Sequence, residues 1–171
     1  MEQAKRPITG MAGRYGHPLH PALVAVPIGA WVASFVFDLA SQVVSDPAAL
    51  ATGSRWLIAV GVLGALAAAT IGLLDLLGLP TGTRVFRTAI VHMSLMLTVV
   101  TAYAVGFALR DPDPTGPVPA GLLALSAAAL ATLTAGAYLG GMLAYRYGVR
   151  VADETTQADG YQPLSTDVKE S

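Results

Sequence analysis

The amino-acid sequence predicts an all-α integral membrane protein that folds as a four-helix bundle. Hydrophobic residues make up 54% of its 171 residues and charged residues only 12%, which is too apolar for an ordinary soluble domain. The apolar residues also gather in stretches of about 20 residues, the length that one membrane-spanning helix needs. None of these stretches carries the charged stripe of a helix that faces water.

Four nearly charge-free stretches define the expected spans. We place the spanning helices at residues 22–44, 55–78, 86–109 and 118–145. The first stretch follows a basic N-terminus, as the apolar part of a signal peptide does. It is longer than a typical signal sequence, contains Asp38 and lacks a clean small-residue cleavage site, so we interpret it as a retained span.

The connections between the spans are short and rich in turn-forming residues, which leaves no room for a soluble domain. We therefore expect an N-terminal segment at residues 1–21, a four-span domain at 22–148 and a disordered tail at 149–171. The tail is polar and lacks hydrophobic periodicity. It contains a YQPL sequence, residues 161–164, that resembles a sorting signal.

Lysine and arginine are distributed unequally between the two ends of the predicted bundle. Eight lie at the end that carries both termini and two at the opposite end. Because basic residues favour the cytoplasmic side, we expect the N-terminal segment and the tail in the cytoplasm. The eight are Lys5, Arg6, Arg14, Arg84, Arg87, Arg146, Arg150 and Lys169, and the two are Arg55 and Arg110.

Charge and composition exclude several classes of function. A net charge of −1 gives no basic surface for nucleic acid, so lipid is the expected surrounding of this chain. The absence of cysteine excludes disulfides, thiolate metal sites and cysteine-ligated iron–sulfur clusters. Catalytic-triad, phosphate-loop and zinc-protease motifs are also missing, and we expect no enzymatic activity from the chain alone.

All three histidines fall at the same end of the predicted bundle. His17 and His20 lie in the motif GHPLHP, just before the first apolar stretch. His92 lies five residues after Arg87, or about 7 Å inside the third span at ~1.5 Å per residue. Ionisable groups at membrane depth usually face the bundle interior with a partner. The alternatives are a metal or haem ligand, and a histidine that only hydrogen-bonds a neighbouring helix.

Two aspartates lie inside predicted spans. Asp75 is close to the C-terminal end of the second span, where the helix dipole disfavours a carboxylate. We expect it to pair with Arg84 or Arg87, to accept from the outer N–H of a ligand histidine, or both. Asp38 lies about 27 Å from His20 along the first helix, too far to share a ligand sphere. For Asp38 we expect an ion pair with Arg55 or a hydrogen bond to Tyr103.

These side chains predict a cofactor site with two alternative occupants. A haem b would take His92 and either His20 or His17 as axial ligands, with Arg84 and Arg87 at the edge of its propionates. A zinc, iron or copper ion would instead take the three histidines with Asp75. A cofactor-free bundle is the third possibility.

Small residues recur every four positions along two of the predicted spans. Such stripes let helix backbones approach closely in lipid, and the wall of a pocket for a flat cofactor would need the same residues. They comprise Gly64, Ala68 and Gly72 in the second span, and Ala128, Thr132, Gly136, Gly140 and Ala144 in the fourth.

Several sequence blocks resemble domain of unknown function 2231, a bacterial multi-pass membrane family. The resemblance covers residues 16–148 and rests on GHPLHPALVAVPIGAW (16–31), FDLA (37–40), GLLDLLGLPTGTR (72–84) and His92. It implies a bacterial plasma-membrane protein. Fusions of some members to Rieske iron–sulfur domains imply a link to electron transfer, with a separate Rieske-type protein as the partner here. The family pattern aligns with His17, His20, Asp38, Asp75 and His92.

Taken together, these features predict a small membrane subunit that carries electrons on haem b. His20 and His92 are the expected axial ligands, His17 is a nearby or substitute ligand, and Asp75 orients one of them. The first alternative is a non-haem metal protein that uses His17, His20, His92 and Asp75. The second is a structural or transport subunit without a cofactor, in which Asp38 and the small-residue stripes matter most.

Overall fold

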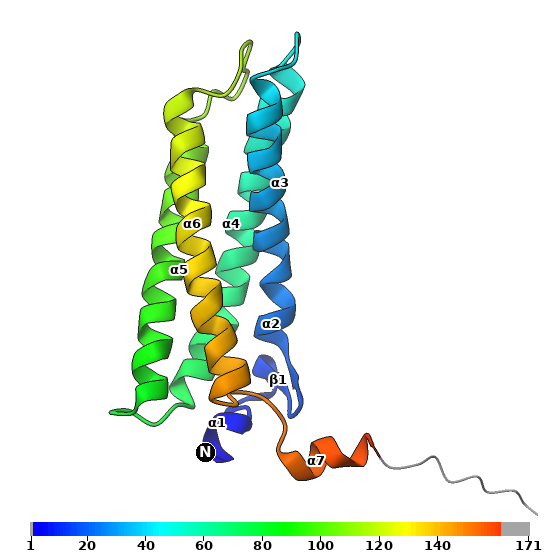
Figure 1. Ribbon diagram of the computed structural model, residues 1–171, viewed down its shortest axis with the longest axis vertical. Coiled ribbons are helices and arrows are strands. Elements are labelled where there is room, and N and C mark those ends of the chain that lie inside the picture. Colours follow the sequence, from blue (N-terminus) through cyan, green and yellow to red (C-terminus); the bar gives the residue numbers. More distant parts are fainter. Residues whose placement is uncertain (1, 162–171) are drawn as a thin grey trace, which may run out of the picture.

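The computed structural model describes residues 2–161 as an elongated bundle of four long helices (Figure 1). Successive helices run in opposite directions, and all four are long and apolar enough to cross a membrane. The predicted all-α four-span architecture is therefore confirmed. The spans are Leu19–Ser41, Ala48–Leu77, Arg84–Leu109 and Ala120–Arg146.

The first span is divided into α2 (Leu19–Leu23) and α3 (Ala25–Ser41). Pro27 explains the division, because proline has no N–H to donate to the carbonyl group of residue 23. The second span is a single helix, α4 (Ala48–Leu77), that begins seven residues before the predicted residue 55. Arg55 is tolerated inside it because its guanidinium lies over the ring of Phe107, 4.4 Å from the centroid.

The third span is α5 (Arg84–Leu109). Thr83 caps its first turn, since the threonine side chain accepts a hydrogen bond from the backbone N–H of Phe86 at 3.2 Å. The fourth span is α6 (Ala120–Gly141), which continues into a π-helical turn, η2 (Met142–Arg146). Both bounds agree with the predicted spans to within a few residues.

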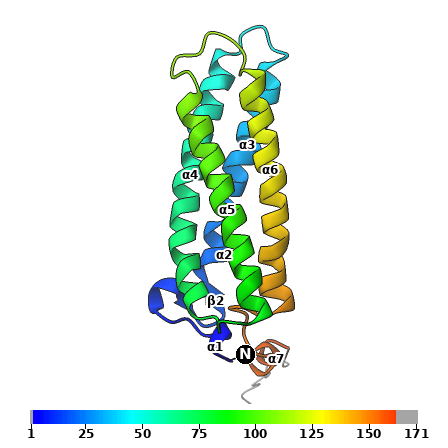
Figure 2. The same cartoon turned by 90° about the vertical axis from the view of Figure 1, so that its left-hand side faces the viewer.

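The four helices form a ring in which α3 and α5 occupy opposite corners. Each of these two helices packs against both α4 and α6, and the two views of the bundle agree on this arrangement (Figure 2). The core lies on the central line between α3 and α5. There the rings of Trp31 and Tyr103 stack in parallel at 4.4 Å, and both are fully buried. Gly61 on α4 leaves space for Trp31, because a β-carbon at that position would overlap the indole.

The N-terminal segment folds across one end of the bundle. It contains α1 (Glu2–Lys5), a 3₁₀ turn, η1 (Gly10–Ala12), and a small hairpin of β1 (Gly13–Arg14) and β2 (His17–Pro18). Gly16 occupies the tight turn of this hairpin with φ of +75°, a conformation that glycine adopts without strain. The segment lies at the same end as the residues that follow η2 (Figure 1).

Arg150 connects the two terminal segments through hydrogen bonds. Its backbone N–H donates to the carbonyl of Ala4 at 2.9 Å, and its guanidinium donates to the carbonyl of Ala12 at 2.7 Å. After it, α7 (Glu154–Asp159) is capped by Asp153, which accepts from the backbone N–H of Thr156. Residues 154–159 of the tail predicted at 149–171 thus form a helix in the described part of the chain. The remainder of that tail, with residues 162–164 of the YQPL sequence, lies outside the described residues.

Candidate site at the paired histidines

Two of the predicted histidines meet on the central line of the bundle. His20 comes from α2 and His92 from α5, and their ring centroids are 6.5 Å apart. The two ring planes are almost perpendicular, at 87°. Both side chains are half-buried inside the predicted membrane region.

Each histidine is fixed by the same kind of hydrogen bond to a neighbouring helix. Nδ1 of His20 lies 2.8 Å from the carbonyl oxygen of Ala68 on α4, and Nδ1 of His92 lies 2.8 Å from that of Gly136 on α6. A carbonyl oxygen can only accept, so both Nδ1 atoms carry the proton. In neutral imidazoles, both Nε2 atoms then keep a free lone pair.

A glycine makes room for each ring. A β-carbon at Gly72 would lie 2.9 Å from Cε1 and Nδ1 of His20, and a β-carbon at Gly140 would lie 3.2 Å from Cε1 of His92. Each glycine lies one helical turn after the residue whose carbonyl accepts the hydrogen bond. The stripe of small residues on α4 therefore ends at the residue beside the imidazole of His20, and the stripe on α6 passes the imidazole of His92 at its last position but one.

The separation of the two rings can be compared with that of two imidazoles bound to one metal ion. With metal–nitrogen bonds of about 2.0–2.1 Å, two imidazoles on opposite sides of an ion have centroids roughly 6 Å apart, whereas the tetrahedral angle of a zinc site brings them to about 5 Å. The observed centroid distance of 6.5 Å is closer to the first of these values. Metal-bound histidines also usually donate their second N–H to a carboxylate or a backbone carbonyl. The pair has both properties.

His17 does not join the pair. It lies exposed on β2, opposite Arg14 in the small hairpin. Throughout residues 2–161, no three histidine, aspartate or glutamate side chains come close enough to hold one ion. The predicted site of three histidines and Asp75 is therefore not assembled in the described part of the chain, because the hairpin turns His17 away from the helix that begins at Leu19.

Asp75 pairs with Arg150, which was not among its predicted partners. Its carboxylate lies 2.9 Å from Nε of Arg150, and both side chains are almost completely buried. This ion pair compensates the unfavourable position of a carboxylate at a helix C-terminus. Asp75 is not the acceptor for either Nδ1–H, since backbone carbonyl groups fill that role.

Arg84 and Arg87 lie exposed in the first turns of α5. In the described structure neither forms an ion pair, because Asp75 is occupied by Arg150. Both arginines lie on the same helix as His92, toward the end that holds the terminal segments (Figure 2). Both are exposed and precede His92 by one to two helical turns.

Asp38 forms the centre of a buried polar cluster at the opposite end. Its carboxylate accepts two hydrogen bonds from Arg110, at 2.6 and 2.9 Å, and a further short one from the hydroxyl of Ser54. The predicted partners, Arg55 and Tyr103, are wrong. Arg110 follows the third apolar stretch directly, at the same end as Asp38, and this position was the available signal for the pair.

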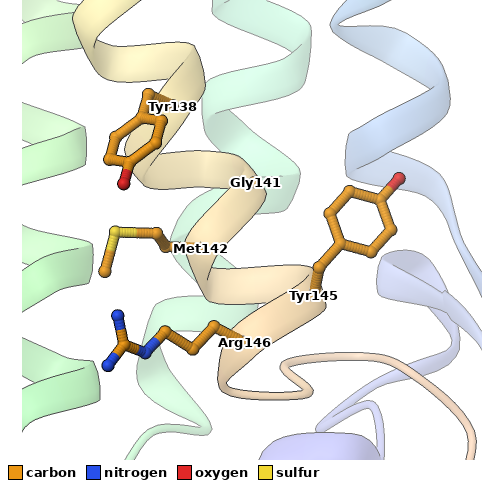
Figure 3. A pocket seen from close by; sticks show the side chains of 5 residues that line it. All are labelled: Tyr138, Gly141, Met142, Tyr145 and Arg146. Carbon is orange, nitrogen blue, oxygen red and sulfur yellow. The ribbon is translucent and has the colours of Figure 1, made fainter.

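An open groove of about 390 Å³ lies on the outer surface, along α6 and η2. Figure 3 shows Tyr138, Met142 and Arg146 on one side of the helix and Tyr145 on the other. Both tyrosines are mostly exposed, as expected for aromatic residues near a membrane surface. The groove contains none of the predicted site residues, so the histidine pair remains the candidate site.

The fold and the buried polar groups define a multi-pass membrane protein. The chain belongs to the family DUF2231, predicted membrane protein, whose sequence profile matches residues 16–153. This match confirms the family that the GHPLHP block indicated. No curated protein and no solved structure matches the chain.

Proposed function

We propose that this protein binds one haem b between His20 and His92 and carries electrons within the bacterial plasma membrane. One observation carries the proposal. The ring centroids of two half-buried imidazoles lie 6.5 Å apart, and each ring has its Nδ1–H bound to a backbone carbonyl and its Nε2 unprotonated in the neutral form. Bis-histidine ligation from two helices of a bundle is a recognised way to hold haem iron.

The surroundings of the pair support a haem in several respects. The carbonyl groups of Ala68 and Gly136 fix the tautomer and the orientation of both rings, which makes each Nε2 a better donor to iron. The exposed cations at Arg84 and Arg87 are available for propionate groups. A haem held by both His20 and His92 would supply electron transfer rather than substrate chemistry, because both imidazoles would be used to hold it.

A second candidate is a single copper, zinc or iron ion held by the same two histidines. Gly72 and Gly140 favour it, because they let the imidazoles pack directly against α4 and α6. A bare ion needs much less space between such closely packed helices than a porphyrin does. The additional ligands of such an ion would be water or exogenous groups, and the protein would serve metal handling or sensing.

The proposal includes the orientation of the bundle in the membrane and the class of its redox partner. Both described ends lie at the histidine end of the bundle, and the lysine and arginine count favours the cytoplasm for that end. The haem would then lie near the cytoplasmic surface. Its redox partner would be a separate one-electron protein, with a Rieske-type protein as the candidate.

The first test is an absorption spectrum of protein purified in detergent from cells supplied with haem precursor. A Soret band, with α and β bands that sharpen on reduction with dithionite, is the expected result. A featureless spectrum would overturn the haem proposal. Metal analysis of the same sample then separates the second candidate from a bundle in which the histidines only connect helices.

A further inference from the structure

The central contacts of this bundle join residues that are separated by the same distance in the sequence. His20 faces His92, Trp31 stacks on Tyr103, and Asp38 pairs with Arg110. In each pair the second residue number exceeds the first by 72. Contacts between equivalent positions of two units are the signature of a two-fold axis that lies between the units.

On the other two helices, α4 and α6, the residues that contact the two histidines are separated by 68 positions in the sequence. The carbonyl of Ala68 accepts from His20 and that of Gly136 accepts from His92, while Gly72 and Gly140 make room for the same two rings. The difference of four residues between the two offsets is close to one helical turn, so the inner faces of α4 and α6 keep the same orientation.

The burial of the helices follows the same two offsets. On α3 and α5, Pro27 corresponds to Val99 and Ser34 to Gly106, and all four residues are buried. On α4 and α6, an offset of 68 relates four consecutive buried positions. These pairs are Ile58 with Ser126, Gly61 with Ala129, Ala65 with Leu133, and Ala68 with Gly136.

We propose that the chain is a tandem repeat of one two-helix unit, and that its two unlike copies pack against each other through equivalent inner faces. The first unit comprises residues 19–77, and the two offsets place the second at residues 91–145. Their two-fold axis runs along the centre of the bundle, perpendicular to the membrane. The histidine site lies on this axis, and each unit contributes one imidazole. The inference does not depend on what the histidines bind.

The charged pair determines which units face each other. Two identical units with aspartate at this position would bring two carboxylates together on the axis, and two with arginine would bring two guanidinium groups together. Asp38 against Arg110 removes the repulsion and favours contact between unlike units. The hydroxyl of Ser54 donates to Asp38, and that of Ser126 lies within hydrogen-bond distance of both Asp38 and Arg110. These two serines are not equivalent positions, because the offset of 68 relates Ser126 to Ile58.

The test exchanges the two charges in the full-length protein. Asp38→Arg alone and Arg110→Asp alone place like charges against each other, and each should lower the Tm in detergent by about 10 °C or more. The double variant D38R/R110D exchanges two positions that the offset of 72 makes equivalent. It should recover most of that loss and elute as the wild-type species in size-exclusion chromatography.

The matched control exchanges the other buried ion pair. Asp75 and Arg150 lie 2.9 Å apart but occupy unrelated positions, since Arg150 follows the last helix with φ of +61° and donates to the carbonyl of Ala12. D75R/R150D should therefore not recover stability. The tandem-repeat proposal would be overturned if D38R/R110D did not recover the Tm lost in the single variants. It would also be overturned if D75R/R150D recovered its Tm to the same extent. Neither outcome bears on haem binding, which the absorption spectrum tests separately.

Discussion

At the scale of single residues, the proposed cofactor site depends on His20 and His92. They are half-buried imidazoles whose Nδ1–H groups are held by backbone carbonyl groups on α4 and α6. Backbone acceptors hold the tautomer at any pH at which the rings are neutral. The outer N–H of a ligand histidine usually donates to a carboxylate or to a backbone carbonyl. A carboxylate would itself titrate, so the backbone carbonyl groups found here are the less pH-sensitive acceptors.

Replacement of either histidine should remove the cofactor to the same extent. His20→Ala and His92→Ala each leave one ligand, and the absorption spectrum of the purified protein should lose its low-spin haem bands in both. The exposed His17 provides the control, since His17→Ala should keep the wild-type spectrum. Loss of the bands in His17→Ala, with retention in His20→Ala, would show that the ligand assignment is wrong.

Substitution of either glycine beside the histidines should weaken cofactor binding as much as the loss of a group that orients a ligand. In Gly72→Ala and Gly140→Ala the new methyl group meets an imidazole ring, and each change should weaken cofactor affinity by about 10–100-fold in a haem titration. Gly29→Ala and Gly121→Ala are matched controls, because a β-carbon at either position meets no atom within 4 Å. Equal effects of all four changes would show that the glycines do not position the rings.

At the scale of elements, the centres of the spanning helices could be predicted from the sequence, but their ends could not. The spans were predictable because about 20 apolar residues have few alternatives to a helix in lipid. The helix boundaries depend on local chemistry such as Pro27, the Thr83 cap and the cation of Arg55 over Phe107. The last of these is a tertiary contact, which explains why the second helix begins earlier than its charge pattern suggested.

Helix α7 should unfold in acid because of its cap. The backbone N–H of Thr156 donates to Asp153, and this bond, followed by a contact with Tyr15, lowers the pKa of the Asp153 carboxyl from its ordinary 3.8. A lowered pKa means that the stabilisation is present above pH 3.8 and is lost as the pH falls through the folded-state value. NMR chemical shifts of residues 154–159 should therefore remain helical at neutral pH and change below about pH 4.

Asp153→Asn is the control for this acid transition. Asparagine caps helices nearly as well as aspartate but does not titrate, so α7 should persist in this variant at neutral pH and through the acid range. Asp153→Ala should lose the helix at every pH. A transition of the same midpoint in Asp153→Asn would assign the pH dependence to another group.

At the scale of the whole molecule, the two described terminal segments and the bundle are connected through Arg150. Its side chain reaches Asp75 on α4 and the carbonyl of Ala12, and its backbone reaches Ala4. Both members of the ion pair are buried, so the loss of one leaves the other charge without compensation. The terminal segments therefore close the histidine end of the bundle as one unit.

Arg150→Ala should release both terminal segments and destabilise the protein by about 3–5 kcal/mol, the usual cost of breaking a buried ion pair. Hydrogen exchange followed by mass spectrometry should show faster exchange in residues 2–18 and 149–161, with the centres of the spans unchanged. The exposed Arg146 supplies the control, because Arg146→Ala removes the same charge without a buried partner. Unchanged exchange in Arg150→Ala would show that the segments are held by other contacts.

The sequence by itself determined that this protein is a four-span bundle and that His20 and His92 lie at the same end. Apolar length and alternating helix direction suffice for both conclusions. Only the tertiary structure decided which side chains meet. It separated His17 from the other histidines, gave Asp75 to Arg150 and joined Asp38 to Arg110. Helical periodicity places a residue on a face, but the rotation and register of neighbouring helices decide its partner, and these depend on packing across the whole bundle.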